Sequence, residues 1–213
     1  IIVKTQGFVN ENFKGNVSKP VELFNDLLAL YQGVDKQQLR ENLKYFLNEV
    51  IPIAQKYDVN LCIHPDDPPF PVLGLPRIVG NTEDIEWLLN AVDIPNNGFT
   101  FCAGSLSSGL HNDVPLMAQK FVKRTHFVHL RSTDVAENGN FIEASHLEGR
   151  GHLVELVRIF EREHPGLPMR VDHGKLMLDD VEKSDNPGYS FYGRMYALAE
   201  VSGIMAAVKD SLK

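Results

Sequence analysis

Helical and strand-like patterns of apolar positions alternate along the chain. The clearest helical pattern follows Asp35, where apolar side chains recur every three or four positions from Leu39 to Ile53. This stripe predicts an amphipathic helix with Asp35 as its N-cap. Similar spacing predicts further helices at residues 21–31, 82–92, 115–124, 151–164 and 192–212, with Asn81 or Thr82 capping the second of these.

Short apolar runs lie between most of these helices and predict strands at residues 59–64, 99–103, 126–130 and 169–172. We expect loops at residues 1–20, in the Gly/Ser-rich run that follows residue 103, and across the polar residues 131–150. Strands that alternate with helices indicate an α/β fold built on a parallel sheet. The chain is short for a complete eight-stranded α/β barrel, which takes about 250 residues, and four strands do not close one. We therefore expect either that the partner strands lie on a missing N-terminal part or that two such chains complete each other.

The composition narrows the classes of function. The formal net charge is −7 and Lys and Arg do not cluster, which argues against nucleic-acid binding. No apolar stretch approaches the ~18 residues that span a bilayer, so we expect no membrane segment. The two cysteines do not make a disulfide framework, and we expect a reducing compartment, the cytoplasm.

Four residues with metal-binding side chains stand at the ends of the four predicted strands: His64, Cys102, His129 and Asp172. Because parallel strands present their carboxyl ends at one edge of a sheet, these side chains are expected to converge. Imidazole, thiolate and carboxylate together suit a divalent transition metal, and the thiolate argues against magnesium or calcium. Ligand chemistry alone favours zinc or ferrous iron. Taken singly, each residue also has an ordinary structural interpretation.

Neighbouring residues add candidate chemistry. Arg131 lies two positions beyond His129 and therefore points to the same side of an extended strand. A guanidinium there suits a substrate carboxylate, which it can bind through two hydrogen bonds. His173 follows Asp172 directly and precedes Gly174, which could turn the imidazole toward a ligand as an acid/base group.

Two further features remain open to more than one interpretation. Asp66 and Asp67 follow His64 in a proline-rich turn, either as acid/base or supporting groups for His64 or as solvated residues of a rigid turn. Cys62 shares a strand face with His64 but lies deeper, so core packing is the better interpretation.

At these residues the chain resembles the mannonate dehydratase family. The segments HPDDPPFPVLGLPRIVG, FVHLRST, EASHLEG, MRVDHGKLMLDD and NPGYSFYGR are similar to motifs of that family and occur in its order, from about residue 35 to the C-terminus. The resemblance implies a hydro-lyase of hexuronate catabolism, which removes water from D-mannonate to give 2-keto-3-deoxy-D-gluconate.

The resemblance also implies a fold, a TIM (β/α)8 barrel of the xylose isomerase type. This chain would supply strands five to eight, and the missing N-terminal half of the barrel would be its partner. Residues 1–34 would form an insertion or lid segment with a short helix, and residues 35–213 the C-terminal part of one catalytic domain. A homo-oligomer such as a dimer is expected.

Site residues follow from the same resemblance. The family's metal ligands match His64, Cys102, His129 and Asp172, and its metal is usually Mn²⁺, with Fe²⁺ as an alternative and Zn²⁺ a weaker candidate. His173 and Tyr189 match its candidates for the base at C2 and the acid at C3 of the sugar acid, in an order that stays open. Arg131, and less strongly Arg77, would bind the substrate carboxylate.

Two alternative functions compete with this interpretation. A metal-dependent sugar isomerase or epimerase on the same barrel would share the removal of a proton without the loss of water. A non-catalytic metal-binding fragment would keep the ligands without turnover.

Overall fold

Four parallel strands form the central sheet of the computed structural model, which describes residues 20–183 and 188–213. The strands pair in the order β1-β2-β3-β6, so each strand lies beside its predecessor in this sheet. Their bounds are Leu61–Ile63 for β1, Asn97–Cys102 for β2, Thr125–His129 for β3 and Met169–Arg170 for β6. The predicted α/β architecture with a parallel sheet is confirmed.

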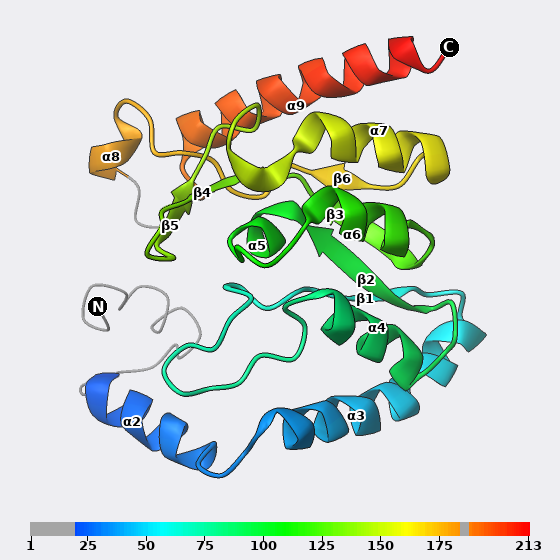
Figure 1. Ribbon diagram of the computed structural model, residues 1–213, viewed down its shortest axis with the longest axis vertical. Coiled ribbons are helices and arrows are strands. Elements are labelled where there is room, and N and C mark those ends of the chain that lie inside the picture. The colour runs from blue at the N-terminus through cyan, green and yellow to red at the C-terminus, as the bar shows by residue number, and fades with distance from the viewer. Residues whose placement is uncertain (1–19, 184–187) are drawn as a thin grey trace.

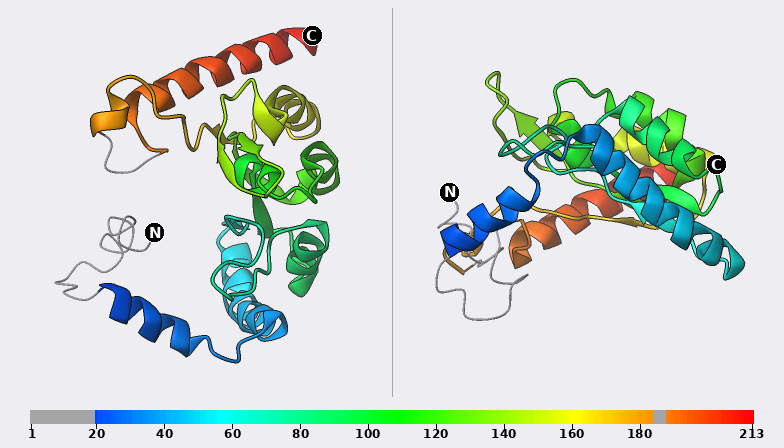
Figure 2. Two further views of the ribbon diagram at one scale, coloured as in Figure 1. Left: turned by 60° about the vertical axis from the view of Figure 1, so that its left-hand side comes forward. Right: turned by 90° about the horizontal axis from the view of Figure 1, so that it is seen from below.

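Helices connect the strands, and contacts join α3 to α4, α6 to α7 and α7 to α9 (Figure 1). In Figure 1 and Figure 2, α4, α6 and α7 lie on the same side of the sheet. Helix α2 lies at the N-terminal end of the described chain and α9 at its C-terminal end. The α-helices are α2 (Pro20–Leu30), α3 (Lys36–Lys56), α4 (Thr82–Ala91), α5 (Ala103–Ser107), α6 (Val114–Phe121), α7 (Leu153–Glu163), α8 (Asp180–Lys183) and α9 (Phe191–Ser211). Two 3-10 turns, η1 (Val122–Arg124) and η2 (Gly149–Gly151), precede β3 and α7.

Side-chain caps explain where three of these helices begin. The Asp35 carboxylate accepts a hydrogen bond from the backbone N–H of Gln38 at 2.8 Å, as predicted for α3. Asn81, rather than Thr82, caps α4: its side-chain oxygen accepts a hydrogen bond from the backbone N–H of Asp84 at 2.9 Å. Asp113 caps α6, which places Pro115 at the second helical position rather than the first.

Segments that we expected to be loops contain regular structure. Within residues 131–150, β4 (Thr133–Val135) and β5 (Phe141–Glu143) form an antiparallel hairpin. The Gly/Ser-rich run after β2 forms α5, and α8 lies in a segment for which no helix was expected. Predicted and observed boundaries of the sheet strands differ by at most two residues. The lid predicted at the N-terminus falls mostly on residues 1–19, outside the described residues.

The core lies between the sheet and its helices. All six residues of β2 are buried, as expected for a central strand with neighbours on both edges. Phe101 of β2 packs edge-on against Phe160 of α7, with ring centroids 5.4 Å apart, and Leu88 of α4 is fully buried in the same cluster. This packing holds the carboxyl ends of the strands in a fixed relation.

Among the described residues, no helix is both long and apolar enough to cross a membrane.

Candidate metal centre

The four predicted ligands all lie at the carboxyl ends of the parallel strands. His64 follows the last residue of β1, while Cys102 and His129 are the final residues of β2 and β3 and are paired in register. Asp172 stands two residues beyond the end of β6. Parallel pairing therefore brings together residues separated by as many as 108 positions in sequence, from 64 to 172.

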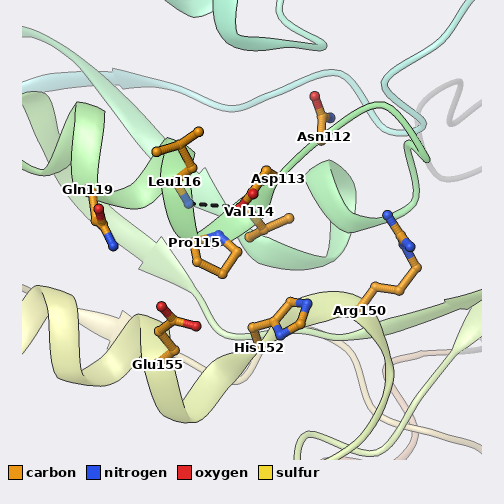
Figure 3. A pocket seen from close by; sticks show the side chains of 9 residues that line it. All are labelled: Asn112, Asp113, Val114, Pro115, Leu116, Gln119, Arg150, His152 and Glu155. Atoms are coloured by element: carbon orange, nitrogen blue, oxygen red, sulfur yellow. Dashed lines mark hydrogen bonds between the residues drawn. The ribbon is translucent and has the colours of Figure 1, made fainter.

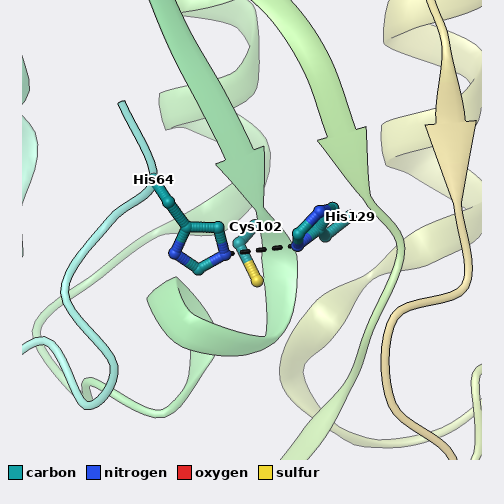
Figure 4. Close-up of side chains that lie close together, drawn as sticks. All are labelled: His64, Cys102 and His129. Atoms are coloured by element: carbon teal, nitrogen blue, oxygen red, sulfur yellow. Dashed lines mark hydrogen bonds between the residues drawn. The ribbon is translucent and has the colours of Figure 1, made fainter. Parts of the chain in front are cut away.

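Side-chain donor atoms converge at this edge. The ligand atoms of His64, Cys102 and His129 lie within 4.8 Å of one another, with the side chains directed inward (Figure 4). His64 Nε2 is 3.2 Å from His129 Nδ1. Asp172 Oδ2 lies 3.5 Å from His129 Nδ1 and 4.0 Å from Cys102 Sγ, so the carboxylate adjoins the same cluster. Three of the predicted ligands thus form a group that could hold a metal ion, and the fourth is beside them.

Hydrogen bonds around the cluster leave its donor atoms available to a cation. His64 Nδ1 lies 2.7 Å from the carbonyl oxygen of Pro65, which can only accept, so Nδ1 donates and Nε2 is left with a lone pair toward the cluster. The hydroxyl of Ser105 donates to Cys102 Sγ at 3.1 Å. Two imidazoles, a buried sulfur and a carboxylate form a donor set that fits a divalent transition metal.

The lowered pKa of the Asp172 carboxyl also favours cation binding. Burial opposes ionisation, but the hydrogen bond from His129 and the nearby His173 and Arg170 hold the pKa of the Asp172 carboxyl well below its usual range. Arg170 Nη2 donates to Asp172 Oδ1 at 2.7 Å. For His129, burial lowers the pKa but the contacts with Asp172 and Cys102 outweigh it, so the net shift is upward. The carboxylate is therefore ionised at neutral pH.

The two predicted proton-transfer groups adjoin Asp172. His173 Nε2 is 3.8 Å from Asp172 Oδ2, and the Tyr189 hydroxyl is 3.5 Å from Asp172 Oδ1. The rings of His173 and Tyr189 meet edge-on with centroids 4.7 Å apart. Burial and the Asp172 charge raise the pKa of Tyr189, which keeps its phenol protonated at neutral pH. Asp172 therefore links the ligand cluster to both groups.

Arg131 is already paired in this structure. Its guanidinium donates to both carboxylate oxygens of Glu143, at 2.7–3.0 Å, and to Asp67 through Nη1. Its side chain is only 4% exposed. A substrate carboxylate would have to displace one of these partners, so the geometry favours a supporting role, and the predicted grip on the substrate stays a prediction.

The paired aspartates of the proline-rich turn have separate partners. Asp66 Oδ2 accepts hydrogen bonds from the backbone N–H groups of Ile78 and Val79, both at 2.8 Å, and thereby closes the loop that follows β1. Arg77 Nη1 lies 3.6 Å from Asp66 Oδ1, so its predicted role toward the substrate likewise stays a prediction. Asp67 binds Arg131. Neither carboxylate is a freely solvated turn residue.

Glu143 is a site residue that the sequence interpretation missed. It lies in β5, inside the segment expected to be a loop, and its Oε1 is 3.0 Å from His173 Nδ1. Its pKa is lowered, because hydrogen bonds and charge from His173 and Arg131 outweigh the effect of burial. The signal that could have identified it is its place at the start of EASHLEG.

A cavity of about 500 Å³ opens beside this pair. It is lined by Phe141, Ile142, Glu143, His173, Gly174, Lys175, Leu176 and Gly188. A separate hollow of about 540 Å³ lies between α6 and α7, and none of the eight predicted site residues lines it (Figure 3). The first cavity has Glu143 and His173 in its wall, while none of the four predicted metal ligands lines it.

Comparisons with known proteins agree with the motifs. A family model described as D-mannonate dehydratase (UxuA) matches residues 4–213. A mannonate dehydratase of Marinomonas sp. (strain MWYL1) is 47% identical over 205 residues, 92% of this chain and 52% of that protein. Mannonate dehydratase 2 of Agrobacterium fabrum (strain C58 / ATCC 33970) is 41% identical over 196 residues, 88% of this chain and 49% of that protein. The chain therefore spans about half the length of these relatives.

Solved structures give the same picture. The crystal structure of mannonate dehydratase from Streptococcus suis serotype 2 superposes with a TM-score of 0.78 at 33% identity, over 84% of this chain and 52% of that one. A structure of the IOLI protein with a bound zinc atom superposes with a TM-score of 0.58 at 14% identity, over 82% of this chain and 59% of that one. The second likeness concerns the fold alone.

Proposed function

This chain belongs to the D-mannonate dehydratase (UxuA) family, and on that premise we propose that it carries the metal-binding and proton-transfer residues of an enzyme that removes water from D-mannonate. One observation supports the proposal above the others. The ligand cluster at the strand ends is joined through Asp172 to His173 and Tyr189, so a cation site and two proton-transfer groups meet at one place.

We propose that His64, Cys102, His129 and Asp172 hold a divalent cation, with Mn²⁺ first, Fe²⁺ as the alternative and Zn²⁺ as a weaker candidate. When bound, such a cation would stabilise negative charge that develops on the substrate oxygens. Metal availability can outweigh the softness of a thiolate, so the sulfur ligand does not exclude Mn²⁺.

His173 and Tyr189 supply the proton transfers that the reaction needs. One group takes the proton from C2, and the other gives a proton to the hydroxyl as the C3–O bond breaks, so water leaves. The resulting enol gains a proton at C3 and loses the proton of its C2 hydroxyl, which gives 2-keto-3-deoxy-D-gluconate. Which group is the base stays open in this proposal.

The wider arrangement is also a proposal. The four-stranded sheet would correspond to strands five to eight of a TIM barrel, which the likeness to the solved mannonate dehydratase supports. Residues 1–34 would form the insertion or lid segment and residues 35–213 the C-terminal part of the catalytic domain. We further propose that the protein is a homo-oligomer, such as a dimer. We also propose that it is cytoplasmic, since a reducing compartment would keep the buried Cys102 thiol available.

Product analysis of the intact protein tests the proposal. Metal-stripped protein is supplied with Mn²⁺ and D-mannonate, and products are followed by NMR. We expect the 2-keto-3-deoxy acid to form only after the metal is restored, and Cys102→Ser protein to form much less of it. An aldose, ketose or epimer as product would contradict the dehydratase and favour the isomerase or epimerase.

A further inference from the structure

A chain of ion pairs and hydrogen bonds, the last of them between Glu143 and His173, crosses the site from the loop after β1 to the loop after β6. Asp67 contacts Arg131, Arg131 contacts Glu143, and Glu143 contacts His173. The members come from four separate parts of the fold: the turns after β1, β3 and β6, and strand β5 of the hairpin. Such a connection fixes side chains that loops alone would leave free to rotate.

The Arg131 end of this chain is rigidly placed. The guanidinium is buried and makes three hydrogen bonds to Glu143, two from Nε and one from Nη2. Gly104 of α5 leaves the space that the arginine stem occupies, because a Cβ at that position would overlap the Cγ and Cδ atoms of Arg131. The hydrogen bonds from Arg131 therefore fix the Glu143 carboxylate in a position that is directed at His173.

The contact with Glu143 fixes one hydrogen position on His173. A carboxylate can only accept, so the 3.0 Å contact requires a hydrogen on Nδ1 of His173. In the neutral ring Nε2 then has the lone pair, and it is the ring nitrogen on the Asp172 side, 3.8 Å from Oδ2. The Gly188 backbone lies against the same ring, where a Cβ would come within 3.2 Å of Cγ and Nδ1.

We infer that Glu143, anchored by Arg131 and Asp67, is a positioning residue that sets the tautomer and orientation of His173 so that Nε2 faces the reacting substrate. The inference rests on the proposed function only in what His173 does with that nitrogen. It also gives Arg131 a different role from the predicted grip on the substrate carboxylate, since its donors hold Glu143 instead.

The test compares Glu143→Gln with Glu137→Gln in the intact protein. Glu137 is exposed at the turn of the same hairpin and serves as the matched control. Steady-state kinetics and metal content are measured on loaded protein. The tautomer of His173 is read from ¹⁵N NMR of histidine-labelled, metal-free protein, with His173→Gln used to assign the signal.

We expect Glu143→Gln to lower kcat about 10- to 100-fold and to change KM by less than about twofold. The variant should retain its bound metal. The Nδ1–H tautomer of His173 should be replaced by a mixture of the Nδ1–H and Nε2–H tautomers. Glu137→Gln should match the unsubstituted protein in every measurement. If Glu143→Gln fails to fold, Arg131→Met/Glu143→Gln replaces the buried ion pair by neutral groups and should show the same mixture of tautomers.

Three results would overturn the inference: kcat and tautomer both unchanged, a rise in KM alone, or loss of the metal. The proposed function fails separately. If the unsubstituted protein makes no keto acid, the dehydratase assignment is wrong, whereas the NMR measurement still decides whether Glu143 sets the His173 tautomer.

Discussion

Hydrogen positions on the histidines decide what each side chain of the site can do. His64 donates Nδ1–H to a backbone carbonyl and His173 donates Nδ1–H to Glu143, so both present Nε2 to the site. His64 Nε2 lies 3.2 Å from His129 Nδ1 within the ligand cluster, while His173 Nε2 lies 3.8 Å from Asp172 Oδ2. The proposed roles of these two residues therefore differ because their neighbours differ.

Substituting His173 tests this division of roles. We predict that His173→Gln lowers turnover by about 10²- to 10⁴-fold, because a positioned acid/base group is removed, while the protein keeps its metal. Turnover and metal content by mass spectrometry measure the two effects. His126→Gln is the control, since His126 lies near the opposite end of β3 and its Nε2 contacts the Pro95 carbonyl. Loss of metal from His173→Gln would make His173 a ligand instead.

At the level of elements, the spacing of apolar residues predicts long helices and the buried central strand well. It predicts the short strands of the hairpin poorly. Helix α3 and the buried strand β2 have enough residues for a pattern to show. Strands β4 and β5 have three residues each and contain no buried apolar residue, so no apolar run identifies them. Glu143 was missed for the same reason, since its role depends on a hairpin that only tertiary pairing reveals.

Helix α5 offers a test of packing behind the site. We predict that Gly104→Ala lowers the free energy of unfolding by about 1–3 kcal/mol, because the added methyl group would overlap Arg131. Gly203→Ala in α9 is the matched control. A Cβ there meets nothing within 4 Å, so that change should stabilise the helix by about 0.5–1 kcal/mol. Denaturant unfolding of the intact protein measures both, and equal effects would contradict this account of α5.

Across the whole molecule, strand order determines which residues meet. The four strand-end residues could be proposed from sequence because parallel strands place their carboxyl ends together, and β1-β2-β3-β6 pairing brings them together. The partners of Arg131 could not be proposed, since Asp67 and Glu143 approach it from loops and a hairpin whose paths depend on tertiary packing. Sequence pattern thus predicted which strand-end side chains lie together better than it predicted the contacts that support them.

Metal binding should stabilise the fold because its ligands come from four separate strands. We predict that Mn²⁺ at about 100 times its dissociation constant adds about 2.7 kcal/mol to the free energy of unfolding. Thermal unfolding of the stripped protein, with and without the ion, measures this gain. Cys102→Ser protein should gain less at the same Mn²⁺ concentration. An equal gain in both proteins would mean that the ion binds elsewhere.

The central claim is that His64, Cys102, His129 and Asp172 together hold the cation that the proposed dehydration requires. X-ray absorption at the edge of the metal bound to the intact protein tests this most directly, since sulfur scatters differently from nitrogen and oxygen. We predict one sulfur neighbour together with nitrogen and oxygen neighbours, and loss of the sulfur signal in Cys102→Ser protein that still contains metal. A spectrum of the unsubstituted protein with no sulfur neighbour would contradict the claim.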